Sequence, residues 1–320
     1  MQYILNERLL ANRLGVSLSY LWWIATLAHT KSNELYTLIK IPKGNGKFRR
    51  VYRVDGKLRF LHGRIKQLLE EELPATGSSY AYEEGASVKQ ASLRMQGYGV
   101  LVSLDFKDHF SSVSMWQVTN MLESHGLRRP VAFLLARLCC ITVGTKSYLP
   151  QGSVVSPLLS NRVCEHLLDP VLDQAFPGAT ITRYSDNLYL GFKGKEVTGK
   201  DVISKAREIV RMETGWRCHK TRVMPYYKRQ RGLGLVLNGE ANMPSEKYYA
   251  MKALLHNLAT KDVDEQMVRA RQDFGFEEQT ILELVPRLKG QLVYWTQFLT
   301  ESRATKLNNL MEKLCQKINH

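Results

Sequence analysis

The stretch RYSDNLYL at residues 183–190 decides the fold, together with the apolar run GYGVLVSLDF at residues 97–106. In the first stretch, two β-rich arms flank Ser185-Asp186, which predicts a tight hairpin. The second run is bounded by glycines and predicts a buried strand that ends at Asp105. Two carboxylates in such apolar surroundings cost free energy unless a cation lies between them. The pattern therefore predicts that Asp105 and Asp186 share a cation site.

A pair of carboxylates on neighbouring strands is typical of in-line phosphoryl transfer. Such a pair can hold two Mg²⁺ ions about 3.5–4 Å apart, one near the attacking 3′-hydroxyl and one near the leaving pyrophosphate. Mg²⁺ retains several water ligands, so that few protein carboxylates are needed. We therefore expect two Mg²⁺ ions as cofactors, with Mn²⁺ able to substitute for them.

The composition indicates a folded protein that binds a polyanion. A chain of 320 residues, 44% of them hydrophobic, can build two or three packed subdomains. The 45 Lys and Arg against 30 Asp and Glu give a formal charge of +15, and the basic residues are spread along the whole chain. Nucleic acid is the first candidate partner for such a surface, and acidic membrane the second.

Cysteine usage and hydropathy indicate a reducing compartment. The five cysteines form no CxxC pair and have no zinc-like spacing. The first residues, MQYILNERLLANRL, lack the pattern of a secretory signal peptide. No stretch reaches about 18 uninterrupted apolar residues, the length that a membrane span needs. We therefore expect a cytoplasmic protein with no membrane partner.

The other elements are predicted from apolar spacing, caps and turn residues. We expect two short helices over residues 7–30, with Ser17 capping the second, and then a basic hairpin over 41–54 around Gly44-Asn45-Gly46. Further helices are expected over 61–73, 115–124, 130–140, 156–176 and 200–213, extended segments over 221–227 and 232–238, and a helical tail from about residue 244. An apolar stripe in that tail is formed by Leu307, Leu310, Met311, Leu314 and Ile318. This order predicts an α+β fold, a sheet flanked by helices and followed by an all-helical tail.

Three motifs carry a resemblance to a known family. They are SLDFKDHF at 103–110, LPQGSVVSPLLSN at 149–161 and RYSDNLYL at 183–190, and in this order they resemble the palm motifs of reverse transcriptases. The resemblance extends to YAYEEGAS at 80–87, HKT at 219–221, GLGLVLN at 232–238 and LKGQLVYW at 288–295. Within the family, the chain most resembles the short bacterial retron and defence-associated enzymes. The resemblance implies a right-hand polymerase with an N-terminal helical extension over 1–40, fingers and an antiparallel palm over 41–240, and a helical thumb over 241–320.

The resemblance also implies metal-binding and catalytic residues. Asp105 and Asp186 match the metal-binding carboxylates, and the main-chain carbonyl of Phe106 matches a further ligand. Asn187 stands where the family hairpin Tyr-x-Asp-Asp has its last Asp. Its amide oxygen can ligate Mg²⁺ weakly or hydrogen-bond a ligand water, but it brings no negative charge. Lys220 matches the lysine proposed as an acid for the leaving pyrophosphate.

Nucleotide-binding roles are likewise implied by the resemblance. The arginine of the basic hairpin, with one of two lysines beside it, matches fingers residues that grip the triphosphate, a task suited to a guanidinium fork. A phenylalanine five residues after the first Asp matches an aromatic gate that excludes a 2′-hydroxyl. A Gln-Gly pair matches the loop that cradles the incoming nucleotide, where glycine permits close backbone approach. These residues are Arg49 with Lys43 or Lys47, Phe110, and Gln151 with Gly152.

Two retron elements are replaced in this chain. QASLR at 90–94 stands where retron enzymes carry Asn-Ala-x-x-His, and GLG at 232–234 stands where they carry Val-Thr-Gly. Both elements are associated with the retron's own structured RNA. Their replacement favours a related defence-associated enzyme that uses its own noncoding RNA.

Three functional readings follow. The first is an RNA-directed DNA polymerase that copies an associated noncoding RNA in antiphage defence; its partners are that RNA, deoxynucleoside triphosphates, the DNA product or RNA–DNA duplex, and in some settings an effector protein. The second is template-independent or protein-primed synthesis by the same palm. The third is a noncatalytic RNA-binding scaffold that lost turnover through Asn187.

Overall fold

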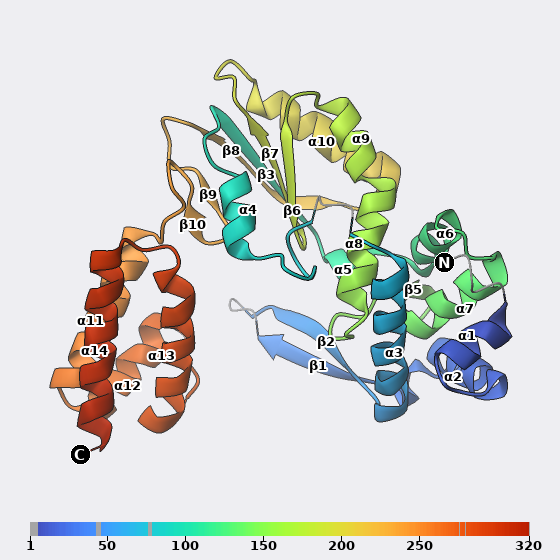
Figure 1. The fold of residues 1–320 in the computed structure, drawn as a ribbon, viewed down its shortest axis with the longest axis horizontal. Helices are drawn as coiled ribbons and strands as arrows, with labels where there is room; N and C mark the ends of the chain where they lie inside the picture. Colours follow the sequence, from blue (N-terminus) through green and yellow to red (C-terminus); the bar gives the residue numbers. More distant parts are fainter. Residues whose placement is uncertain (1–5, 43–45, 76–78, 275, 279, 320) are drawn as a thin grey trace. The chain divides into compact units, whose positions relative to one another are not determined.

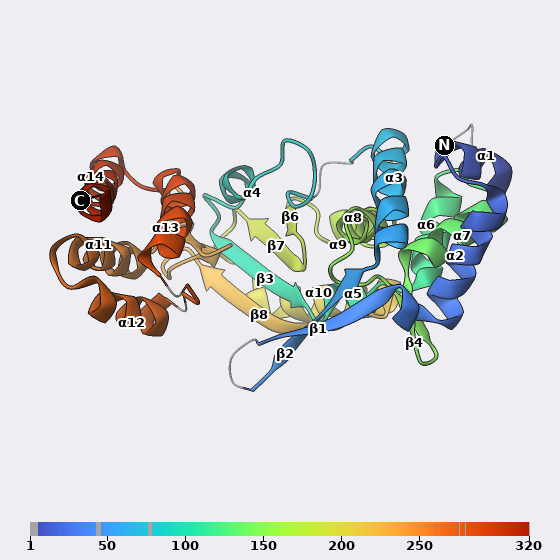
Figure 2. The same ribbon diagram turned by 90° about the horizontal axis from the view of Figure 1, so that it is seen from below.

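The computed structural model of the protein describes residues 6–42, 46–75, 79–274, 276–278 and 280–319. The chain forms two compact units: the first comprises residues 1–87 and 99–223, and the second comprises 88–98 and 224–320. Each has its own hydrophobic core. The elements of both units are labelled in Figures 1 and 2.

One end of the first unit is a cluster of helices. The two N-terminal helices pack on each other, and both pack on the helix over Arg129–Cys139. Ser17 accepts a hydrogen bond from the Tyr20 amide and so begins the second helix where the sequence predicts it. Leu21 and Ile24 of that helix are fully buried. The four helices are α1 (Glu7–Arg13), α2 (Leu18–Thr30), α6 (Met115–Ser124) and α7 (Arg129–Cys139).

A basic two-stranded ribbon follows the N-terminal helices, as predicted (Figure 2). After the short turn η1 (Ser32–Glu34), strand β1 (Tyr36–Pro42) pairs antiparallel with β2 (Phe48–Val54) in a register that sets Ile41 opposite Arg49. The turn residues Lys43, Gly44 and Asn45 lie outside the described residues. Helix α3 (Gly56–Glu72) comes next and begins five residues earlier than predicted, because Asp55 caps it.

The centre of the first unit is a four-stranded sheet in the order β6-β7-β3-β8. β7 pairs antiparallel with both β6 and β3, so the predicted hairpin and the predicted buried strand are neighbours (Figure 1). Helix α10 (Gly199–Thr214) packs against β3. The strands are β3 (Val100–Phe106), β6 (Thr180–Tyr184), β7 (Asn187–Phe192) and β8 (Cys218–Pro225).

Short elements connect the sheet to the helices of the first unit. They include α5 (His109–Ser112), β4 (Ile141–Val143) and β5 (Lys146–Tyr148). The single helix predicted over 156–176 is wrong in one respect, because it is two helices, α8 (Ser156–Leu167) and α9 (Asp169–Ala175). Pro170 has no amide hydrogen to continue the first helix and fits the first turn of the second.

The second unit is mainly helical. Its four long helices share one apolar core, and the predicted stripe on the last of them contributes buried Leu307, Met311 and Leu314. The segment GLGLVLN at 232–238, predicted to be extended, contains only the second residue of β9 (Arg231–Gly232) and the two-residue strand β10 (Leu235–Val236). Helix α4 (Val88–Arg94), which the sequence did not predict, also belongs to this unit. The long helices are α11 (Ser245–Thr260), α12 (Val263–Phe274), α13 (Ile281–Thr296) and α14 (Glu301–Asn319).

The predicted α+β fold with an antiparallel sheet and a helical tail is confirmed. The division into extension, fingers with palm, and thumb is a functional one and stays a prediction. Among the residues that the structure describes, no helix is long and apolar enough to cross a membrane.

Candidate active site

The two predicted carboxylates lie next to each other at one end of the sheet. Tyr184 and Asn187 pair across the hairpin, so Ser185 and Asp186 form its two-residue turn, with Ser185 in the left-handed region at φ 57°. On the neighbouring strand, Asp105 pairs with Asn187. The Phe106 amide donates a hydrogen bond to the Asp186 carbonyl at 2.8 Å. The sheet therefore brings together Asp105 and Asp186, which are 81 residues apart in sequence.

The donor set at this end of the sheet suits a hard cation. The Asp105 side chain is 22% exposed, and Asp186 and Asn187 are half-buried. Asn187 Nδ2 donates to Asp186 Oδ1 at 3.0 Å, so the amide orients one of the two carboxylates. No group of three His, Cys, Asp or Glu side chains suited to a metal occurs among the described residues. Two carboxylates, supplemented by amide, main-chain and water oxygens, fit Mg²⁺, which needs few protein ligands.

A histidine side chain contacts Asp105. His219 is the second residue of β8, and its Nδ1 lies 3.3 Å from Asp105 Oδ1. Lys220 is the next residue of the strand, and its side chain is exposed. Sequence reasoning assigned a role to Lys220 and none to its neighbour, although both belong to the quoted HKT motif.

Phe110 lies at the edge of an aromatic cluster. It is half-buried in α5, with its ring centroid 6.4 Å from that of Tyr82 and 5.6 Å from that of His109. His109 also packs against Phe106 and Trp216. Burial, reinforced by the charge of a nearby arginine, lowers the pKa of His109 to about 3. His109 is therefore a neutral aromatic ring within this cluster.

The predicted nucleotide-binding residues of the basic ribbon and of the Gln-Gly loop lie on segments in direct contact. The Tyr52 amide of β2 donates to the Gln151 carbonyl at 2.7 Å. Gly152 has φ 112°, and a Cβ there would lie 2.5 Å from the Tyr52 carbonyl oxygen. Glycine is therefore required both for the backbone conformation and for the close approach. Lys47 and Arg49 are exposed and lie a few residues before Tyr52 on the same ribbon.

A buried histidine, His62 of α3, holds Ser153, the residue that follows Gly152 in this loop. His62 Nε2 lies 2.8 Å from the Leu138 carbonyl, so this nitrogen carries the proton. Its Nδ1 therefore accepts from the Ser153 hydroxyl, also at 2.8 Å. Burial lowers the pKa of His62 to about 4, which keeps it neutral. The residue after Gly152 is thus fixed to α3 by a neutral histidine.

Buried ion pairs support the segment that precedes β3, and sequence reasoning missed them. Arg162 Nη1 and Nη2 donate to the two carboxylate oxygens of Glu83 at 2.8 and 2.9 Å. Arg183, fully buried, pairs with Asp169 at 2.7 Å. The available signal was an arginine on the inner face of an otherwise apolar helix or strand, which is rare unless it is paired.

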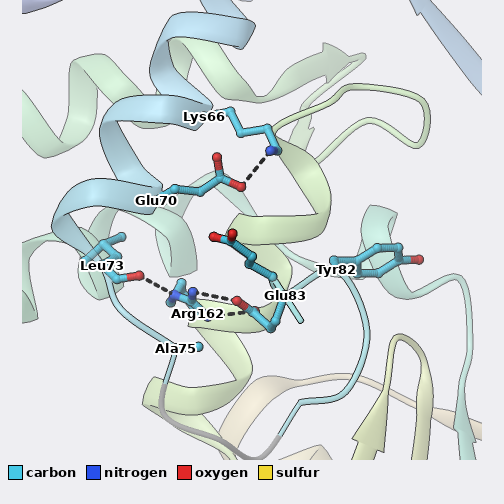
Figure 3. Close-up of a pocket in the computed structure, with 8 residues that line it drawn as sticks. Lys66, Glu70, Leu73, Ala75, Tyr82, Glu83 and Arg162 are labelled. Atoms are coloured by element: carbon cyan, nitrogen blue, oxygen red, sulfur yellow. Dashed lines mark hydrogen bonds and ion pairs between the residues drawn. The ribbon is translucent and has the colours of Figure 1, made fainter. Parts of the chain in front are cut away.

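The Arg162–Glu83 ion pair borders a cavity of about 590 Å³ (Figure 3). Two charged pairs lie in its walls: Lys66 Nζ lies 2.6 Å from Glu70 Oε1, and Arg162 holds Glu83. The ring of Tyr82 points away from the Arg162–Glu83 pair. The residues that line the cavity include Lys66, Glu70, Tyr82, Glu83, Glu84 and Arg162.

Comparisons with known proteins agree with this geometry. The profile of the family described as "Reverse transcriptase (RNA-dependent DNA polymerase)" matches residues 41–235, which is more than half of the chain. The retron Mx162 reverse transcriptase of Myxococcus xanthus is 30% identical over 282 residues, covering 78% of this chain and 58% of that protein. The retron Mx65 reverse transcriptase of the same organism is 28% identical, covering 84% of this chain and 66% of that protein. The chain thus spans less than two thirds of the length of these two curated relatives.

A third relative and a solved structure extend the comparison. The retron Ec86 reverse transcriptase of Escherichia coli is 26% identical over 234 residues, covering 70% of this chain and 69% of that protein. A foamy viral protease-reverse transcriptase in complex with an RNA/DNA hybrid has a TM-score of 0.40 at 16% identity, covering 88% of this chain and 33% of that chain. The assignment rests on the sequence matches. The chain belongs to the reverse transcriptase (RNA-dependent DNA polymerase) family.

Proposed function

We propose that the protein is an RNA-directed DNA polymerase that uses two-metal-ion nucleotidyl transfer. The observation that carries this proposal is the juxtaposition of Asp105 and Asp186 on neighbouring strands, fixed by the hydrogen bond between the Phe106 amide and the Asp186 carbonyl. The Asn187 amide that orients Asp186 supplies a further oxygen at the same place. Together with the Phe106 carbonyl, these groups would hold two Mg²⁺ ions, with Mn²⁺ able to replace them.

The remaining site residues act on the nucleotide. When bound, the metal ions activate the primer 3′-hydroxyl and neutralise the leaving pyrophosphate. Arg49 and Lys47 bind the triphosphate, for which planar guanidinium donors are suited. Gln151 and Gly152, attached to the same ribbon through Tyr52, cradle the base and sugar of the incoming deoxynucleotide.

Two further residues complete the proposed mechanism. The Phe110 ring excludes a 2′-hydroxyl by steric contact and so selects deoxynucleotides. Lys220 is the proposed proton donor to pyrophosphate, from the strand on which His219 contacts Asp105.

The proposed template is an associated noncoding RNA, and the proposed role is antiphage defence. The charge of +15 favours a nucleic acid partner that is recognised through phosphates and 2′-hydroxyls. Three similar proteins are named retron reverse transcriptases. An RNA–DNA duplex would be the product complex, and an effector protein would connect synthesis to defence.

The experiment that tests this function uses protein purified with its cellular RNA. Labelled deoxynucleotides are added with Mg²⁺, with EDTA, and after ribonuclease treatment. The expected product is DNA that requires Mg²⁺ and intact RNA and whose sequence is complementary to the co-purified RNA. In cells challenged with phage, the Asp105→Ala variant should lose any protection that the wild-type protein gives.

Other products would contradict the proposal. DNA covalently attached to the protein, or DNA made after complete removal of RNA, would indicate protein-primed or template-independent synthesis. RNA that co-purifies without any incorporation would indicate a noncatalytic scaffold, the reading that the neutral Asn187 favours.

A further inference from the structure

Tyr82 adopts a backbone conformation that tyrosine rarely takes. Its φ is 65°, in the left-handed region, and its side chain is 48% exposed. A bulky residue in this region costs conformational free energy and persists only where the surrounding structure imposes it. An exposed tyrosine gains little from burial, so the cost is not offset by the hydrophobic core.

The segment around Tyr82 is held on both sides by buried groups of the first unit. The Tyr80 amide donates to the Arg183 carbonyl of β6 at 2.9 Å. The Asn161 amide group of α8 donates to the Ala81 carbonyl at 2.7 Å. After Tyr82, the Glu83 carboxylate is clamped by Arg162 of the same helix (Figure 3). The left-handed residue is therefore fixed between anchors on β6 and α8.

These anchors direct the Tyr82 side chain to the hairpin turn that carries Asp186. The Tyr82 hydroxyl shares a hydrogen bond of 2.9 Å with the Ser185 hydroxyl. Ser185 is the other residue of the turn and also has a positive φ, of 57°. The ring of Tyr82 is tilted by 47° against that of Phe110, with a centroid distance of 6.4 Å. Two residues with positive φ, 103 positions apart, thus meet beside the proposed metal site.

We propose that Tyr82 is a positioning residue for nucleotidyl transfer. Its hydroxyl holds the Ser185 turn, and through that turn it holds the Asp186 carboxylate in register with Asp105. The bond acts on the catalytic step rather than on nucleotide binding, because it ends on the metal-ligand turn and not on the Gln151 loop. This inference rests on the proposed function of Asp105 and Asp186.

The test compares Tyr82→Phe, Ser185→Ala and the double variant, with Tyr227→Phe as the control. Tyr82→Phe keeps the ring and removes only the hydroxyl, and Tyr227 is 72% exposed on the other unit. Each single variant should lower kcat for deoxynucleotide incorporation about tenfold and leave the nucleotide KM within about twofold of wild type. The double variant should lower kcat no further than either single variant, because both substitutions remove the same hydrogen bond. Losses that multiply would overturn the proposal.

A second measurement follows the turn without any turnover. Amide hydrogen exchange of the protein alone should be several-fold faster at Phe106 and Asn187 in Tyr82→Phe, because the Phe106 amide bonds to the Asp186 carbonyl. Unchanged exchange together with unchanged kcat would overturn the proposal. If the wild-type protein incorporates no deoxynucleotide, the proposed function fails, whereas faster exchange in Tyr82→Phe would still establish the Tyr82–Ser185 bond as the support of the turn.

Discussion

At the scale of single residues, Asn187 is the main departure from the family pattern. Its amide donates to Asp186 at 3.0 Å, which orients one carboxylate but adds no negative charge. Asn187→Asp replaces this donor by a third carboxylate close to Asp105, its pairing partner. We expect the variant to keep or raise the rate of deoxynucleotide incorporation and to reach half-maximal rate at lower Mg²⁺ concentration. A Mg²⁺ titration of both proteins checks this, and a severe loss of rate would mean that the site is built around the amide.

His109 contributes to the pH dependence of stability. Both ring nitrogens lack hydrogen-bond partners in the described structure, and burial lowers the pKa to about 3 from an ordinary value of 6.5. The unfolded state therefore binds the proton first, and stability falls as pH drops below 6.5. Between pH 6.5 and pH 5 the loss from this residue is about 2 kcal/mol. His62, with a pKa of about 4, contributes a loss in the same direction.

The variant His109→Phe should weaken this pH dependence. A phenyl ring keeps the contacts with Phe106 and Trp216 and removes two unsatisfied polar atoms. We expect a gain of about 1 kcal/mol at pH 7 and a larger gain at pH 5, measured by urea unfolding. The exposed His256→Phe serves as the control and should change neither value. An equal pH dependence in wild type and His109→Phe would contradict this account.

At the scale of elements, the contact between the basic ribbon and the Gln-Gly loop depends on Gly152. A methyl group there meets the Tyr52 carbonyl oxygen at 2.5 Å, and φ is 112°. Gly152→Ala should destabilise the protein by about 1–3 kcal/mol and should raise the KM for deoxynucleotides, because the loop separates from β2. Gly144→Ala is the matched control: its φ of 61° is also positive, but no atom lies within 4 Å. Equal effects of the two variants would show that the contact is unimportant.

Local patterns were sufficient to predict most elements. The hairpin over 180–192, the strand that leads to Asp105 and the stripe on α14 all follow from period and turn residues. The break between α8 and α9 was missed because the apolar spacing continues across Leu168, although Pro170 lies inside the range predicted as one helix. Helix α4 is only seven residues long and has two buried residues, which is too weak a pattern to recognise.

At the scale of the whole molecule, the site depends on contacts that sequence patterns do not encode. Asp105 and Asp186 were predicted because each carries its own local signal. The approach of His219 to Asp105, and of Tyr82 to Ser185, joins residues about 100 positions apart. Arg162 and Arg183 lie among apolar neighbours in the sequence, but only the fold shows which carboxylates meet them. Pairings of this kind depend on which strands become neighbours.

The excess of positive charge predicts how the affinity for RNA, the proposed partner, would depend on salt. A formal charge of +15 implies that phosphate contacts contribute much of the affinity and that bound counterions are released. Between 50 and 200 mM KCl we expect the affinity for single-stranded RNA to fall on the order of 10²-fold, measured by filter binding. The affinity of the Asp186→Ala variant for RNA should show the same dependence on KCl concentration, because the substitution leaves the basic surface intact. An affinity independent of salt would contradict a phosphate-based interface.

The measurement that tests the central claim most directly is Mg²⁺-dependent incorporation of labelled deoxynucleotides by Asp105→Ala and Asp186→Ala. Asp264→Ala, an exposed aspartate of α12, is the control. We predict that the incorporation rate of each of the first two variants falls on the order of a thousandfold or more, because metal-ion catalysis is lost. RNA should still co-purify with both variants, and the control should retain the wild-type rate. Wild-type incorporation in either variant would contradict the assignment of these two carboxylates as the metal site of a polymerase.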